Sequence, residues 1–225
     1  MPVEYPPSRN EEPRFIVVEG PIGVGKTSLT RRLAASLSGE AILEQISDNP
    51  FLERFYKSGG SGALPAQLYF LFQRAKQLED LRQSDLFSPV RVANFHISKD
   101  RLYAEVSLDR EELALYEQMH AKMNIDPPVP DLVIYLQASV DVLLQRIVQR
   151  AIPYERFIER HYLEKITEAY ARYYHNYDEA PLLIVNASSI DPVYNNDDYA
   201  QLFEQVCRTT SGRHFFNPTG AVALA

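Results

Sequence analysis

The sequence predicts an α/β fold: a single domain built on a doubly wound, parallel, five-stranded sheet with helices on both faces. Short β-branched apolar runs alternate with segments of helical spacing along most of the chain. The first apolar run, FIVVEG, ends in glycine and leads into the helical segment SLTRRLAASL. Because strands and helices alternate, consecutive strands should run parallel and helices should cover both faces of the sheet.

Each expected element follows from its local pattern. Apolar runs bounded by glycine, proline or polar residues predict strands at 14–20, 41–46, 89–95, 131–136 and 181–188. Helical spacing predicts helices at 28–37, 50–57, 65–82, 110–123, 140–150, from the segment AIPYER to about 177, and 198–206.

The domain is expected to span residues 14–212. Residues 1–13 are proline-rich and polar, with too little apolar surface to offset the entropy cost of ordering, so we expect a disordered tail. Residues 213–225 should form an irregular C-terminal tail.

Composition excludes several classes of protein. A formal net charge of -7 and a pI near 5.3 argue against an extended nucleic-acid surface, which needs a basic stripe. A single cysteine, Cys207, cannot form an internal disulfide, and the first residues lack the apolar region of a signal peptide. No apolar run is long enough to span a membrane. We expect a cytoplasmic protein that binds anions only locally.

The segment GPIGVGKT predicts a phosphate-binding loop. It fits the pattern G-x-x-x-x-G-K-[ST] through Gly20, Gly25, Lys26 and Thr27, between an expected strand and an expected helix. Glycines let backbone N–H groups converge on one anion, and the helix N-terminus adds its dipole. Lys26 would reach the β and γ phosphates, and the Thr27 hydroxyl would be a ligand of Mg²⁺.

The rest of the chain narrows the class of phosphate-loop protein. It has no N-K-x-D motif for reading guanine, and the run DLVIYL ends without the acidic pair of a Walker B strand. A small single-domain phosphotransferase therefore fits better than a GTPase or an oligomeric ATPase.

Several further segments, in this order, resemble the deoxyribonucleoside kinase family, especially its bacterial deoxyadenosine and deoxyguanosine kinase branch. The resemblance covers about residues 14–190. It is carried by EGPIGVGKTSL, LEQISDNPFLERFY, QLYFLFQRAKQ, PDLVIYLQASVDVLLQRI and YERFIERHYLEKI. It implies a P-loop kinase fold with a short lid, ATP as phosphoryl donor and Mg²⁺.

The resemblance assigns acceptor-side roles to four residues. Glu44 matches the glutamate that takes the proton of the sugar 5′-hydroxyl, and Tyr56 matches a tyrosine that contacts the 3′-hydroxyl. Gln67 and Arg74 match the pair that reads the base, and their spacing of seven puts them on one helix face. The alternatives are a solvated strand-end charge for Glu44, a core side chain for Tyr56 and an exposed polar stripe for the pair.

The resemblance also assigns a lid over the donor. Arg146 and Arg150, four residues apart, match arginines that clamp the donor phosphates, and Glu155 matches a glutamate beside the sugar and the reacting phosphate. The alternative for the arginines is a pairing with the helix dipole. The expected ATP-binding set is Gly20, Gly23, Gly25, Lys26, Thr27, Ser28, Arg146 and Arg150.

Two positions depart from the family pattern. Asn94 stands where the third strand of relatives ends in a carboxylate, and an amide is a poorer Mg²⁺ ligand and no base. Asp100 and Arg101 are possible substitutes, although SKDR also reads as a helix start capped by Ser98. Ala151 and Ile152 stand where the lid often shows glycine and arginine.

Two functions remain open at this point. The first is ATP-dependent phosphorylation of a deoxynucleoside at its 5′-hydroxyl, with Glu44, Lys26, Arg150 and Asn94 at the reaction centre. The second, favoured by Asn94 and Ile152, is a catalytically impaired nucleotide-binding protein that acts as a sensor or interaction partner. Lys99 falls close to the place where an acidic residue accompanies cytidine preference, so we expect a purine substrate, in particular deoxyadenosine. The resemblance implies a homodimer.

Overall fold

The computed structural model describes residues 15–82 and 90–218. Six strands form one sheet in the order β2-β3-β1-β4-β5-β6, and every neighbouring pair is parallel. The strands are β1 (Phe15–Glu19), β2 (Glu40–Ile42), β3 (Arg91–Ala93), β4 (Leu132–Gln137), β5 (Leu182–Asn186) and β6 (Arg213–Phe216).

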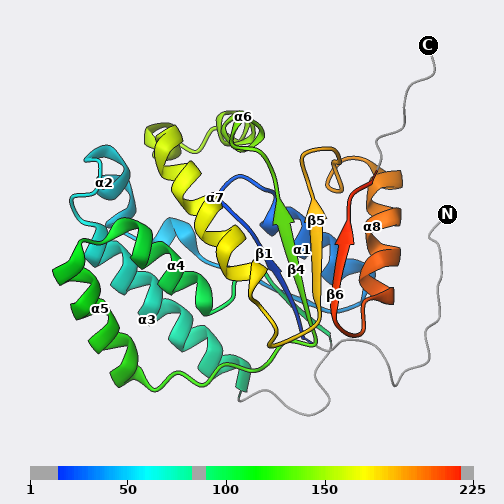
Figure 1. Ribbon diagram of the computed structural model, residues 1–225, viewed down its shortest axis with the longest axis horizontal. Helices are drawn as coiled ribbons and strands as arrows, with labels where there is room; N and C mark the ends of the chain where they lie inside the picture. Colours follow the sequence, from blue (N-terminus) through cyan, green and yellow to red (C-terminus); the bar gives the residue numbers. More distant parts are fainter. Residues whose placement is uncertain (1–14, 83–89, 219–225) are drawn as a thin grey trace.

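Helices connect and cover these strands (Figure 1). The helices are α1 (Lys26–Ser36), α2 (Leu52–Lys57), α3 (Ala63–Arg82), α4 (Ser98–Ser107), α5 (Arg110–Met123), α6 (Val140–Arg150), α7 (Arg160–His175) and α8 (Asn196–Arg208), with short 3₁₀ turns η1 (Ile46–Asp48) and η2 (Glu155–Phe157). Figure 1 shows α7 in front of the sheet and α1 behind it.

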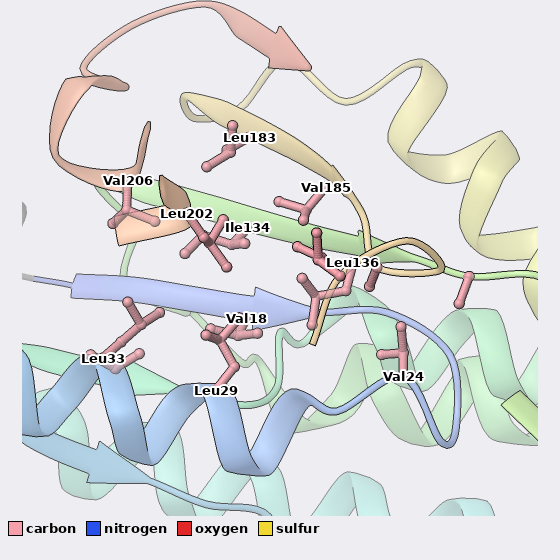
Figure 2. Close-up of a cluster of buried hydrophobic side chains, with 14 of the residues drawn as sticks. Val18, Val24, Leu29, Leu33, Ile134, Leu136, Leu183, Val185, Leu202 and Val206 are labelled. Carbon is pink, nitrogen blue, oxygen red and sulfur yellow. The ribbon is translucent and has the colours of Figure 1, made fainter. Parts of the chain in front are cut away.

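Alternate residues of β1 feed two separate cores. Ile16 and Val18 pack on the side of α1 and α8, where Leu33 and Leu202 are fully buried (Figure 2). Val17 packs on the opposite side, which is covered by α4 and α7. Both faces of the sheet are therefore buried, as strand sequences without polar alternation predict. Replacing a fully buried leucine such as Leu33 by alanine should lower the free energy of unfolding by about 2–5 kcal/mol.

The sheet has one strand more than the sequence predicted, so the expectations of five strands and of an irregular segment from 213 onward are wrong for residues 213–216. These residues, RHFF, form β6 at the edge of the sheet. Only two of its four residues are apolar, which is too short a run to mark a strand, and only Phe216 is partly buried. Residues 1–13 and 219–225 lie outside the described residues.

Several element boundaries differ from expectation by a few residues, and two of these differences affect the site. β2 ends at Ile42, so Glu44 lies two residues beyond the strand rather than at its end. Helix α4 has Ile97 at its N-cap position, so Ser98 is the first helical residue rather than the cap. Both differences lie at the carboxyl edge of the sheet, where the chain leaves strand geometry to build the site.

Candidate active site

The site lies at the carboxyl edge of the sheet, beside β1. β1 pairs with β3 on one side and with β4 on the other. From β1 the connections therefore lead to opposite sides of the sheet, which makes the carboxyl end of β1 a topological switch point. In open parallel sheets ligands bind in the crevice at such a switch point. Here the β1–α1 loop, the ends of β2 and β3, and helices α2, α3, α4 and α6 contribute residues to one cavity of about 530 Å³.

The β1–α1 loop has a backbone that requires glycine at two positions. Gly20 has a φ of 146°, and a Cβ there would lie 2.4 Å from the carbonyl oxygen of Leu136. Gly25, directly before α1, has a φ of 106°. Residues with a side chain rarely adopt these backbone conformations, so glycine is needed at both positions for the loop to curve around the helix N-terminus.

Lys26 lies over its own loop. Its Nζ donates to the carbonyl oxygens of Gly20 at 2.7 Å and Pro21 at 3.0 Å. Removal from water, together with the charge of Lys99, lowers the pKa of Lys26 to about 7. An incoming phosphate would add an anionic partner to the two carbonyl oxygens that the ammonium contacts. Thr27 and the exposed Ser28 follow it in the cavity wall.

Asn94 connects the two halves of the site. It follows β3, is 1% exposed, and its side-chain oxygen accepts from the backbone N–H of Glu44 at 2.7 Å. Its Nδ2 donates to the hydroxyl oxygen of Thr27 at 3.0 Å. The amide therefore ties the segment after β2 to the phosphate-binding loop, using both its acceptor and its donor.

Glu44 is the centre of a buried group of charges, which we call the acceptor-side charge cluster: Glu44, Arg74, Lys99 and Asp100. Their side chains are 2%, 3%, 6% and 1% exposed. One Glu44 carboxylate oxygen pairs with Arg74, and the other accepts from Lys99 Nζ at 2.7 Å. Arg74 also pairs with Asp100.

The two cations determine the ionisation of Glu44. Burial alone would raise the pKa of this carboxyl, but Arg74 and Lys99 overcome it and lower the pKa to about 2. Glu44 is therefore a carboxylate throughout the physiological range of pH. Because a carboxylate has about four acceptor positions, each oxygen can still accept a further hydrogen bond.

Tyr56 and Gln67 face the cavity beside this cluster. Tyr56 stacks on Tyr154 with ring centroids 6.4 Å apart and lies edge-on to Tyr162 at 6.1 Å. Burial raises the pKa of Tyr56 well above its ordinary value, so the phenol stays neutral. Gln67, from α3, is 3% exposed and lines the same wall.

The arginines of α6 approach from the other side. Arg146 donates to the carbonyl oxygens of Val24 at 3.2 Å and Ala187 at 2.8 Å, which joins the phosphate-binding loop to the turn after β5. Arg150 makes a bidentate ion pair with the buried Glu155: its Nε donates to Oε2 at 2.9 Å and its Nη2 donates to Oε1 at 2.5 Å. Ile152, between them, also lines the cavity.

The structure brings nearly all the site residues predicted from sequence to this one cavity. Gly20 does not line it, because it is buried where the loop leaves β1. The others all do: Gly23, Gly25, Lys26, Thr27, Ser28, Glu44, Tyr56, Gln67, Arg74, Asn94, Arg146, Arg150 and Glu155.

A match to a family of known proteins accompanies this geometry. The sequence model of the deoxynucleoside kinase family matches residues 16–210. The chain belongs to the deoxynucleoside kinase family. It is thus a phosphotransferase, and the family implies ATP as the phosphoryl donor.

Curated relatives agree with this membership, and a solved structure shares the fold. The chain is 36% identical over 200 residues to a deoxyguanosine kinase of Bacillus subtilis (strain 168), covering 85% of this chain and 95% of the relative. It is 28% identical over 207 residues to a deoxyadenosine kinase of Lactobacillus acidophilus, covering 86% and 94%. The structure of a deoxyadenosine kinase from M. mycoides with bound dATP has the same fold, with a TM-score of 0.74, 22% identity, and coverage of 86% and 98%.

Neither suggested substitute for a carboxylate at Asn94 takes its place in this kinase. Asp100 is fully buried, but its carboxylate pairs with Arg74 rather than facing the phosphate-binding loop. Arg101 lies at the surface and pairs with Glu105 at 2.9 Å and Glu117 at 3.4 Å. The site therefore has an amide, held by two hydrogen bonds, between Glu44 and Thr27.

Sequence reasoning missed one buried carboxylate. Glu19, the last residue of β1, is fully buried and accepts from the backbone N–H of His96 at 2.7 Å and from the hydroxyl of Tyr170 at 2.9 Å. It thereby joins the ends of β1 and β3 to α7 beneath the loop. The signal was available, since an acidic residue ends an otherwise apolar run.

The donor groups present fit a Mg²⁺ ion shared with a nucleotide. Among the described residues, no group of three or more His, Cys, Asp or Glu side chains could hold a metal ion. Mg²⁺ in kinases uses few protein ligands and takes most of its oxygens from water and phosphates, so the Thr27 hydroxyl at the loop meets the requirement.

Within the ranges 15–82 and 90–218, no helix is long and apolar enough to cross a membrane.

Proposed function

We propose that the protein transfers the γ-phosphoryl group of ATP to the 5′-hydroxyl of a purine deoxynucleoside, with Mg²⁺ bound to the phosphates and the Thr27 hydroxyl. The observation that carries this proposal is the position of Glu44: a buried carboxylate that faces the same cavity as Lys26 and is tied to Thr27 through Asn94. A proton acceptor and a phosphate-binding loop on one cavity are what in-line transfer requires.

On the donor side, backbone N–H groups of the loop and the Lys26 ammonium would hold the β and γ phosphates. Mg²⁺ would supply charge neutralisation between these phosphates. Arg150 would contact the transferred group from the lid: an arginine has five N–H donors, and its bonds to Glu155 use only Nε and Nη2. Arg146 would hold the phosphate-binding loop against the turn after β5 through its bonds to both.

On the acceptor side, the 5′-hydroxyl would donate to a Glu44 carboxylate oxygen. As the bond from O5′ to the γ phosphorus forms, the bond from that phosphorus to the β,γ-bridging oxygen breaks and its electron pair leaves with ADP. The hydroxyl proton passes to Glu44. With a pKa near 2, Glu44 is a weak base, so it serves chiefly to orient the hydroxyl and accepts the proton late in the step.

Tyr56, Gln67 and Glu155 would complete the nucleoside pocket. Gln67 offers a donor and an acceptor in one plane to a base edge, whereas Tyr56 and Glu155 would contact the sugar hydroxyls. Arg74 reaches both Glu44 and Asp100, so we assign it to positioning Glu44 as well as to the base. Relatives named as deoxyguanosine and deoxyadenosine kinases support a purine, used in nucleotide salvage.

The same family membership supports a cytoplasmic homodimer. Light scattering at working concentration should give twice the chain mass of 25.7 kDa. A monomer at that concentration would refute the dimer without affecting the assignment of the reaction.

The reaction itself is tested with a coupled-enzyme assay of ADP release across the four deoxynucleosides, with ATP and Mg²⁺. We expect turnover with deoxyadenosine and deoxyguanosine and weaker turnover with the pyrimidines. Binding of a purine deoxynucleoside without ADP release would instead support a nucleotide-binding protein that has lost activity, which Asn94 and Ile152 would then explain.

A further inference from the structure

Lys99 is the one member of the acceptor-side charge cluster that lines the cavity and has no role in the reaction described above. It enters from the second residue of α4, and its Nζ lies 2.7 Å from Glu44. Asp100, the next residue, pairs with Arg74 of α3. Arg74 of α3 and Lys99 of α4 thus each pair with a different oxygen of the Glu44 carboxylate.

We propose that Lys99 is a positioning residue for phosphoryl transfer, which fixes the Glu44 carboxylate in the orientation that receives the 5′-hydroxyl. The proposal rests on the proposed function, because it assigns Lys99 a part in the same reaction. Glu44 lies beyond the end of β2, in a segment without regular hydrogen bonds to neighbouring strands. A single ion pair would let the carboxylate rotate about its last bond, whereas two ion pairs on separate oxygens fix its plane.

Charge balance favours the same role. The cluster has two cations and two anions, and its net charge is zero because Asn94 beside it is neutral. Without Lys99 the cluster would carry one net negative charge. When Glu44 accepts the hydroxyl proton, the cluster gains one positive charge next to the anionic phosphoryl group. Lys99 lines the same cavity as Lys26, and its charge contributes to the lowered pKa of Lys26.

Stability alone does not account for this lysine. A buried ion pair often contributes no more than well-packed apolar side chains of similar volume would. The pair between Lys57 and Glu53 has nearly the same length, 2.6 Å, but its side chains are 47% and 57% exposed, and exposed pairs contribute little to stability or to orientation. Lys57 is therefore a matched control for Lys99.

The test compares Lys99→Met, Lys99→Arg and Lys57→Met in the full chain, with kcat and KM for a purine deoxynucleoside and the thermal midpoint. We expect Lys99→Met to lower kcat between about tenfold and a hundredfold with KM changed far less. Lys99→Arg should recover part of the loss because it restores the cation, and Lys57→Met should match wild type. If Lys99→Met does not fold, Lys99→Gln carries the same comparison.

A double-mutant cycle separates positioning of Glu44 from a general effect on the fold. In the Glu44→Gln background the Lys99→Met change should alter kcat by less than about twofold, since the carboxylate it orients is gone. An unchanged kcat in Lys99→Met, or an equal loss with and without Glu44, would overturn the inference. An inactive wild-type protein would instead overturn the proposed function, so the two failures are distinguishable.

Discussion

The two halves of the cavity are built in different ways. The phosphate-binding loop of the donor half is one continuous segment, in which backbone geometry at Gly20 and Gly25 places Lys26 and Thr27 at the start of α1, and the α6 arginines join it from elsewhere. The acceptor half is assembled from side chains far apart in the sequence: Lys99 and Glu44 are 55 residues apart, and Arg74 and Glu44 are 30 apart. Asn94 is the hydrogen-bonded link between the halves.

This difference predicts how each half fails. The donor half binds phosphate through a preformed backbone as well as through Lys26, so removing the lysine should weaken phosphate binding and leave the loop folded. The acceptor half holds four buried charges against one another, so removing any one leaves another uncompensated. Substitutions there should therefore change stability as well as rate, and the two effects must be measured together.

The largest effect is expected for Lys26→Ala. Loss of the ammonium that faces the β and γ phosphates should lower turnover about a thousandfold while the thermal midpoint stays close to wild type. Steady-state kinetics and a melting curve check both statements, with Lys57→Ala as the control for removing a lysine. Retained kcat would mean that the phosphate-binding loop does not act as assigned.

Glu44→Gln should have the next largest effect. The amide keeps the shape but cannot take the proton, so kcat should fall about a hundredfold with little change in nucleoside KM. The variant also leaves Arg74 and Lys99 facing a neutral group, so its thermal midpoint should fall too. Glu53→Gln, which breaks an exposed pair, should change neither quantity. A rise in KM alone would make Glu44 a binding residue.

Asn94→Asp sharpens the comparison at the link between the halves. An aspartate can accept from both the Glu44 N–H and the Thr27 hydroxyl, which leaves the lone pairs of Thr27 for Mg²⁺. We expect kcat to rise at least about tenfold and the Mg²⁺ requirement to fall. Kinetics against Mg²⁺ concentration test this. An unchanged or lower kcat in Asn94→Asp would show that the site works with the amide and does not need the carboxylate found in relatives.

The smallest effect concerns proton uptake on ATP binding. Lys26, with a pKa of about 7, is mostly neutral in the free protein at pH 8. Bound phosphates favour its charged form and raise the pKa, so binding should take up about one proton per site at this pH. Titration calorimetry in buffers of different ionisation enthalpy measures the uptake, which Lys26→Ala should abolish. Proton release or no exchange in wild type would contradict the assignment.

The comparison also explains what the sequence could predict. The phosphate-binding loop was predicted because all of its determinants are local: strand, glycines, lysine and helix follow in order. The helices α5 and α6 were predicted at their observed bounds because their apolar spacing is continuous. β6 was missed because it is an edge strand whose residues are mostly exposed.

The acceptor half could be predicted only by resemblance, and incompletely. Resemblance to the family led to Glu44, Gln67 and Arg74, but not to the pairing of Arg74 with Asp100 or of Lys99 with Glu44. Those ion pairs depend on how α3 and α4 pack together, which no local pattern encodes. Likewise the ion pair of Arg150 with Glu155 joins two residues that we had assigned to different substrates.

The position of the transferred phosphoryl group tests the central claim most directly. In a single-turnover reaction with γ-labelled ATP, Mg²⁺ and deoxyadenosine or deoxyguanosine, the label should appear on the 5′ oxygen of the nucleoside, and Glu44→Gln should slow its appearance about a hundredfold. Label on the 3′ oxygen, or no labelled nucleotide from either purine while ATP remains bound, would contradict a Glu44-centred acceptor site.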